Sequence, residues 1–119
     1  MARITRVALA ATALVALAPV QAAGLGFMAK GPMARFNDAD MKLLNDAIAQ
    51  ARSAKDAGTA VEWANDKTGS SGSVTPVRAF EEGGLACRDL RVVNRHKQLE
   101  SAGVYAMCQR KDGTWQWKQ

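Results

Sequence analysis

The two cysteines of this chain, Cys87 and Cys108, have the chemistry with the widest consequences. Two thiols can form a structural disulfide, act as a redox pair or contribute ligands to a metal ion. A thioredoxin-type redox pair uses the spacing Cys-x-x-Cys, whereas 20 residues lie between these two. A structural zinc ion takes four ligands, and the only histidine is His96. The residues therefore favour a disulfide over the other two interpretations, and we expect no metal and no cofactor.

The other reactive side chains do not form a recognisable catalytic centre. Glu81 and Glu82 are adjacent, so in a strand they point to opposite faces, unlike the carboxylate pair of a glycosidase. The serines of residues 70–73 lack the strand-turn-helix setting of a nucleophile elbow. His96 lies in a polar turn segment, where a lone histidine is usually solvated. We therefore expect a protein that is not an enzyme.

The N-terminus has the layout of a secretory signal peptide. Arg3 and Arg6 precede an apolar run at residues 7–18, and a small-x-small triplet predicts cleavage after Ala22. An uncleaved anchor is the alternative, but a membrane span needs about 20 apolar residues. We expect export of residues 23–119 to the periplasm, the outer membrane or the cell surface, with no lipid anchor, because no cysteine follows the apolar run. There the two cysteines should pair, and closing that loop would stabilise the fold by about 3 kcal/mol.

The remaining 97 residues are enough for one small domain. Residues 23–36 contain three glycines and a proline without a clear period, which predicts a flexible arm or linker before a domain at 37–119. Residues 85–119 hold seven lysines and arginines against three acidic residues. An anionic polymer or membrane surface could be attracted to this basic half, although a solvated face is the simpler interpretation. Export argues against nucleic acid as a partner.

The sequence predicts a helix over residues 38–56. Asn37 or Asp38 can cap it, and Gly58 ends it. An apolar stripe follows the helical period and predicts a face that packs on a sheet; its members are Met41, Leu44, Ile48 and Ala51.

After Gly58 the apolar period changes to two, which indicates strands. Pro76 predicts an edge strand or a bulge, and Val92-Val93 predicts a bulge or a strand covered on both sides. The sequence KDG, which ends at Gly113, indicates a hairpin that leads into Trp115 and Trp117. We expect an α+β fold in which an N-terminal helix packs on a four- to five-stranded antiparallel sheet with one disulfide.

The segments WANDKTGSSGSVTP, GGLACRDL and AMCQRKDGTWQW resemble the C-terminal domain of the rickettsial 17 kDa surface antigen family. This resemblance covers roughly residues 38–117 and implies a protein of the cell envelope, for which the family supplies no reaction. The chain lacks the lipobox cysteine and the glycine-zipper segment, has Gln109 where arginine is usual, and lacks glycine in the turn NRHKQLES. The matching positions are Trp63, Asn65, Thr68, Gly69, Gly72, Val74, Thr75, Pro76, Phe80, Cys87, Arg88, Cys108, Asp112, Gly113 and Trp115.

Two groups of residues are candidates for binding. Arg88, Arg91 and Arg95, with the following His96 and Lys97, can form a basic ridge, although Arg88 can instead pair locally with Glu62, Asp66 or Asp89. The cluster at residues 65–72 can cradle an ion, but its residue types are mainly those of turns. Among the tryptophans we assign Trp63 and Trp115 to the core and expect Trp117 to be exposed.

The leading hypothesis is an exported structural or binding module without catalysis. It would bind an unknown envelope component, which is a protein, peptidoglycan or another anionic polymer. An inhibitor of lysozyme or of another envelope hydrolase is the alternative, because small disulfide-linked β domains suit that task. An envelope enzyme is a third and weaker hypothesis.

Overall fold

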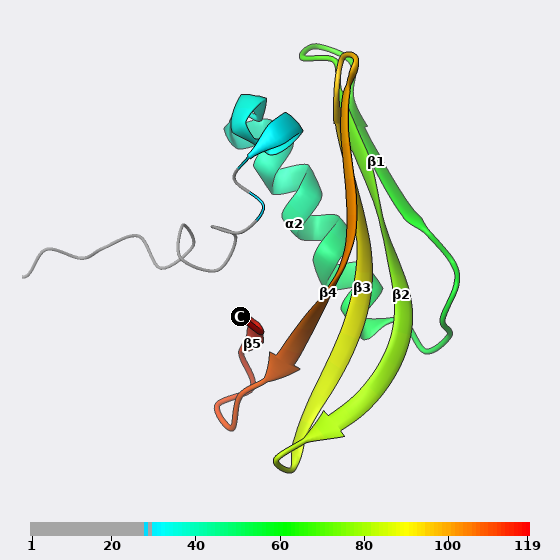
Figure 1. Cartoon of the computed structure of the whole chain (residues 1–119), viewed down its shortest axis with the longest axis vertical. Helices are drawn as coiled ribbons and strands as arrows, with labels where there is room; N and C mark the ends of the chain where they lie inside the picture. Colours follow the sequence, from blue (N-terminus) through cyan, green and yellow to red (C-terminus); the bar gives the residue numbers. More distant parts are fainter. Residues whose placement is uncertain (1–27, 29) are drawn as a thin grey trace, which may run out of the picture.

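The fold is one helix packed on a five-stranded antiparallel sheet with strand order β1-β2-β3-β4-β5 (Figure 1). This computed structural model describes residue 28 and residues 30–119, so the expected signal peptide at residues 1–22 lies outside the described residues. The expected α+β class, helix, sheet and disulfide are confirmed. The elements are η2 (Gly31–Arg35), α2 (Asp38–Ser53), β1 (Val61–Asn65), β2 (Ser70–Glu82), β3 (Leu85–His96), β4 (Leu99–Gln109) and β5 (Trp115–Trp117).

The helix α2 begins where the sequence predicts and ends at Ser53, three residues before the expected end. Asn37 is the cap: its Oδ1 accepts a hydrogen bond from the Asp40 amide at 2.8 Å, and an Asp40 carboxylate oxygen accepts from the Asn37 amide at 3.1 Å. This reciprocal pair is a capping box. The backbone leaves the helix at Ala54, which is extended. Gly58, with φ +93°, instead donates its amide to the carbonyl of Pro76 in β2 at 2.8 Å.

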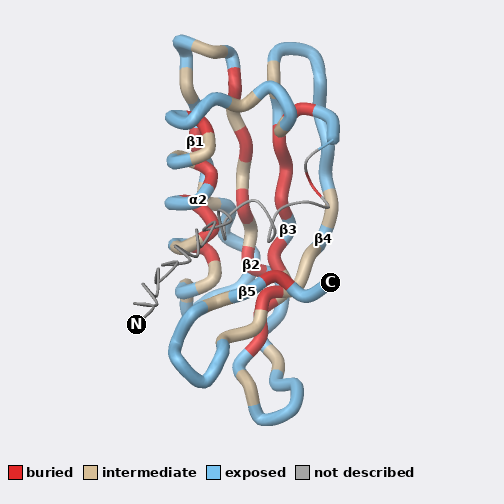
Figure 2. Tube along the Cα trace, turned by 90° about the vertical axis from the view of Figure 1, so that its left-hand side faces the viewer, coloured by how far each residue is buried: buried red, intermediate tan, exposed pale blue. Residues whose placement is uncertain are grey.

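The core lies between α2 and one face of the sheet. The apolar stripe of the helix and the alternate residues of the strands meet there, and Figure 2 shows the buried positions running along β2 and β3. Met28 also belongs to this cluster, and Met33 and Phe36 pack against it, so the described part of the predicted arm lies against the domain. The principal buried members are Leu44, Ala47, Ile48, Ala51, Trp63, Val74, Leu90, Val92, Met107 and Trp117.

Both irregular strand positions are explained by the sheet. At Pro76 the register between β2 and β3 shifts, and β1 pairs with β2 only as far as Val74. The proline, which has no amide hydrogen to donate, therefore lies at a bulge opposite β3 and beyond the last residue that pairs with β1. Val92 and Val93 are both buried, and β3 pairs with β4 without a shift there. The predicted bulge is therefore absent at this pair, and Val93 is buried on the outer face although its neighbours on that face, Arg91 and Arg95, are exposed.

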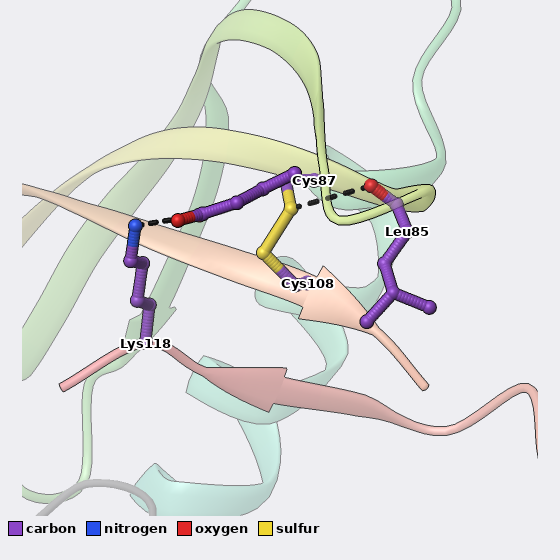
Figure 3. A network of polar contacts seen from close by, with 5 residues as sticks. Leu85, Cys87, Cys108 and Lys118 are labelled. Carbon is purple, nitrogen blue, oxygen red and sulfur yellow. Dashed lines mark hydrogen bonds and ion pairs between the residues drawn. A yellow bond between two sulfur atoms is a disulfide. The ribbon is translucent and has the colours of Figure 1, made fainter. Parts of the chain in front are cut away.

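Cys87 and Cys108 form the expected disulfide (Figure 3). They are directly opposite each other in the register of β3 and β4, with their Cα atoms 4.0 Å apart. Both alternate with residues that face α2, so the bridge lies on the outer face of the sheet. On the same face, Lys118 Nζ donates to a Glu82 carboxylate oxygen at 2.5 Å and thereby links the C-terminus to β2.

The position of Trp117 corrects the expectation that it is exposed. Only 8% of its surface is accessible, because β5 pairs with β4 so that Trp117 is opposite Met107 on the helix-facing side. Its ring meets the edge of Tyr105, with centroids 6.3 Å apart. Trp115, expected in the core, is only half-buried, and the Arg52 guanidinium lies 5.9 Å from its ring centroid.

We predict that Gly72→Ala destabilises the domain by about 2 kcal/mol, because overpacking a filled core forces backbone shifts. A Cβ at this position would lie 2.4 Å from the Val93 carbonyl oxygen and 2.8 Å from Nε1 of Trp63. Urea denaturation measures the change. Ser73→Ala, on the same strand but on the opposite face, is the control and should change the free energy of unfolding little. An unchanged midpoint for Gly72→Ala would contradict the packing described here.

Candidate functional site

The carboxylate of Asp40 joins the start of α2 to the turn between β1 and β2. The side chain has no accessible surface. Its Oδ1 accepts hydrogen bonds from Asn65 Nδ2 and from Thr68 Oγ1, each at 2.8 Å. Asn65 and Thr68 were candidates for an ion cradle. Both side chains instead donate hydrogen bonds to the Asp40 carboxylate of α2. Within the turn, the Thr68 and Gly69 amides donate to the Asn65 carbonyl.

Hydrogen bonding determines the ionisation of Asp40. Burial alone would raise its pKa, but hydrogen bonds from Thr68, Asn37, Asn65 and Ser70 outweigh burial and leave the pKa below its ordinary value of 3.8. Asp40 is therefore a carboxylate at neutral pH. Its negative charge lies in the first turn of α2, where the helix dipole also favours it.

Asp40, Ser70 and His96 are the residue types of a hydrolase triad, but their arrangement is different. His96 Nδ1 lies 2.8 Å from Ser70 Oγ, and the Ser70 amide donates at 3.3 Å to Thr68 Oγ1, which in turn donates to Asp40. The serine thus stands between the acid and the histidine, whereas in a triad the histidine stands between the other two. Only 1% of Ser70 is accessible, so a substrate cannot reach its hydroxyl. This group holds the end of the sheet together and offers no exposed nucleophile.

Arg88 holds the other end of α2. It is 9% accessible, and its Nη1 donates to the carbonyl of Ala54, the C-cap residue, at 2.6 Å. A cation at this end of a helix is favoured by the dipole and satisfies a carbonyl that has no partner within the helix. The local ion pair considered for Arg88 is therefore replaced by this contact, and Asp89 pairs with Arg78 at 3.0 Å.

The tryptophan and glycine of the motif are also structural partners. Trp63 packs over Gly72, its direct neighbour in the register of β1 and β2. The ring of Phe36 meets Trp63 edge-on, with centroids 5.2 Å apart. In the turn before β5, a carboxylate oxygen of Asp112 accepts from the amide and the hydroxyl of Thr114, while Gly113 has φ +89°.

The structure does not bring the predicted basic ridge together. Arg88 faces α2 and is buried, whereas Arg91 and Arg95 point from the outer face and are exposed. Arg95 makes an ion pair with Glu100 at 3.5 Å. With Trp117 buried as well, two of the four residues considered for binding belong to the interior, and binding by Arg91 and Arg95 stays a prediction.

The described residues form open cavities that have room for a ligand. A cavity of about 430 Å³ is lined by Arg35 and by the turn between β3 and β4, residues 96–99. One of about 300 Å³ lies beside the disulfide and β5. The sulfur atoms of Cys87 and Cys108 lie within 4.8 Å of a Glu82 oxygen, but both belong to the disulfide and are not available as thiolate ligands. In the described part of the chain, no helix has the length and hydropathy to span a bilayer.

Comparisons with known proteins agree with the motif. The family described as "17 kDa outer membrane surface antigen" matches residues 50–116. A 17 kDa surface antigen of Rickettsia bellii strain RML369-C is 34% identical over 86 residues, which cover 70% of this chain and 53% of that protein. A second Rickettsia bellii protein of the same name has the same identity and coverage. The chain thus spans about half the length of these relatives. No solved structure matches it.

The sequence did not reveal Asp40 as the centre of a network or His96 as its outer member. The capping pattern indicated a position for Asp40 in the first turn, but nothing local shows that a hairpin 25 and 28 residues later supplies its donors. The partner of Arg88 lies 34 residues away in the chain. These contacts exist only once the helix lies across the sheet.

We predict that Asp40→Asn lowers the free energy of unfolding at pH 7 by about 2 kcal/mol, because the new amide group faces a backbone donor that needs an acceptor. The pKa of Asp40 is lower in the folded state, so its stabilisation is present above the ordinary value of 3.8 and is lost as the pH falls through the folded pKa. The difference between wild type and variant should therefore narrow below about pH 4 in urea denaturation series.

The control for this variant is Asp46→Asn on the same helix. Asp46 is exposed and pairs with Lys42 at 2.9 Å, so its loss should cost less than about 0.5 kcal/mol. If both substitutions lowered the free energy of unfolding equally, the buried hydrogen bonds of Asp40 would contribute no more than the exposed ion pair of Asp46.

We also predict that Arg88→Met destabilises the domain by about 1.5 kcal/mol, because it removes a charged donor from the end of α2. The amides of the last helical turn should exchange with deuterium faster than in the wild type. Arg91→Met, on the same strand but exposed, is the matched control and should leave both measurements unchanged. Wild-type exchange in the last turn of Arg88→Met would contradict the assigned contact.

Proposed function

We propose a function in the cell envelope on one premise: this chain belongs to the 17 kDa outer membrane surface antigen family. The protein is exported, loses residues 1–22, and acts in the periplasm or at the outer membrane and cell surface as a structural or binding module without catalysis. The Rickettsia bellii relatives are named as surface antigens. The N-terminal pattern and the disulfide, which persists in oxidising compartments, support the same location.

The proposal that the protein has no catalytic role rests on the contacts that the motif residues make inside the fold. Asn65 and Thr68 bind the carboxylate of α2, Trp63 packs on Gly72, and Arg88 binds the end of the helix. The residues that define the resemblance are therefore engaged in holding one fold. A motif made of such residues indicates that the members of the family share this fold. Contacts with a binding partner would then be made by other surface residues.

The test is fractionation of cells that express the full chain with a C-terminal tag, followed by mass spectrometry without reduction. We expect the protein in the envelope or periplasmic fraction, with a mass that begins at Ala23 and is lower by two hydrogens because of the disulfide. The variant Ala22→Arg removes the small residue that the peptidase requires and should retain the full N-terminus. Protein found only in the cytoplasm, uncleaved and with two free thiols, would refute the proposal.

A further inference from the structure

The cavity beside the β3–β4 turn has basic residues among those that line it. Of the described lining residues, Arg35, His96 and Lys97 are basic, Gln98 is an amide and Leu99 is apolar. The cavity measures about 430 Å³, which is within the usual size of sites for small ligands. None of the described residues that line it is acidic. Among the described residues, Arg35 and Lys97 take part in no ion pair, and the nearby Glu100 is engaged by Arg95.

One wall of this cavity, His96, is held in place by hydrogen bonding to Ser70 at the end of the sheet. His96 Nδ1 lies 2.8 Å from the buried Ser70 hydroxyl. Nδ1 is therefore occupied by the Ser70 hydroxyl. This leaves Nε2 as the imidazole nitrogen available to a ligand. The imidazole is thus oriented before any ligand arrives.

The backbone of Lys97 is held as well. Its amide donates to the Gly69 carbonyl at 2.9 Å, which joins the turns β1–β2 and β3–β4 at one end of the sheet (Figure 1). Lys97 is also the one described residue other than glycine with a positive φ, of 53°. The turn itself requires this conformation, because Lys97 is the first of the two residues that join the paired His96 and Leu99, and such two-residue hairpin turns need a positive φ there.

We propose that this cavity, the Arg35 notch, binds the phosphate group of a phosphorylated sugar. A phosphate monoester carries about two negative charges near neutral pH, so it matches a cluster of cations better than a carboxylate with a single charge does. Arginine supplies a planar pair of donors and lysine a point charge. Gln98 and Leu99 add an amide for hydroxyl groups and an apolar wall for a ring. That the sugar belongs to an envelope polymer rests on the proposed function, whereas the binding itself does not.

The test is an NMR titration of the oxidised protein, purified from cells that express the full chain, with glucosamine 1-phosphate at near-physiological salt. We expect saturable shifts of the His96 imidazole and of the amides of residues 97–99, with a Kd of about 1 mM or lower. Arg35→Gln and Lys97→Asn should each weaken binding at least about fivefold. Asparagine is chosen at residue 97 because it tolerates a positive φ.

The matched control is Lys111→Gln, which removes one exposed cation from the β4–β5 turn. It should leave the affinity unchanged, and equal weakening by all three substitutions would overturn the site in favour of general charge attraction. Absence of saturable shifts would overturn the proposal. Equal affinity for inorganic phosphate would overturn the assignment to a sugar, and binding only to vesicles that contain phosphatidic acid would replace it with a membrane surface. A titration without binding would overturn the phosphate site but would not contradict an envelope location. A cytoplasmic location would overturn the proposed function but would not contradict a measured affinity.

Discussion

The structure depends on fastening one helix to the sheet at both of its ends. An amphipathic stripe alone defines which side of α2 faces the sheet, but apolar contacts are not directional and leave the helix free to slide or tilt. The hydrogen bonds at Asp40 and at Arg88 are directional and charge-assisted. They also satisfy helix ends whose backbone groups lack partners. Together they specify one position of the helix along the strands.

The two faces of the sheet stabilise the domain in different ways. The face toward α2 carries the core, and its close contacts leave no room for a side chain at Gly72. The outer face carries the disulfide, the Arg78–Asp89 ion pair and the contact between Glu82 and Lys118. The covalent bridge therefore reinforces the sheet from the side that the helix does not cover. A small domain gains from this because its core supplies only a narrow margin of stability.

The scaffold and the Arg35 notch are physically connected. Asp40 fixes the β1–β2 turn and Ser70, and these in turn position His96 and Lys97. The buried carboxylate thus contributes to stability and to the shape of a surface cavity through the same few hydrogen bonds. Residues that build the fold and residues that can meet a ligand are adjacent in this molecule but distinct.

From the amino-acid sequence one can predict the helix with its cap, the strands, the Asp-Gly hairpin and the pairing of the two cysteines. Each of these depends on local periodicity, on turn chemistry at neighbouring residues such as Asp112 and Gly113, or on there being only two thiols to join. Tertiary structure alone decided that Trp117 is buried, that Arg88 and Arg91 face opposite sides, and that Asp40 meets Asn65 and Thr68. Burial of a strand residue depends on its register and on what covers that face of the sheet. Hydrogen-bond partners that are distant in the chain meet only after the elements have packed.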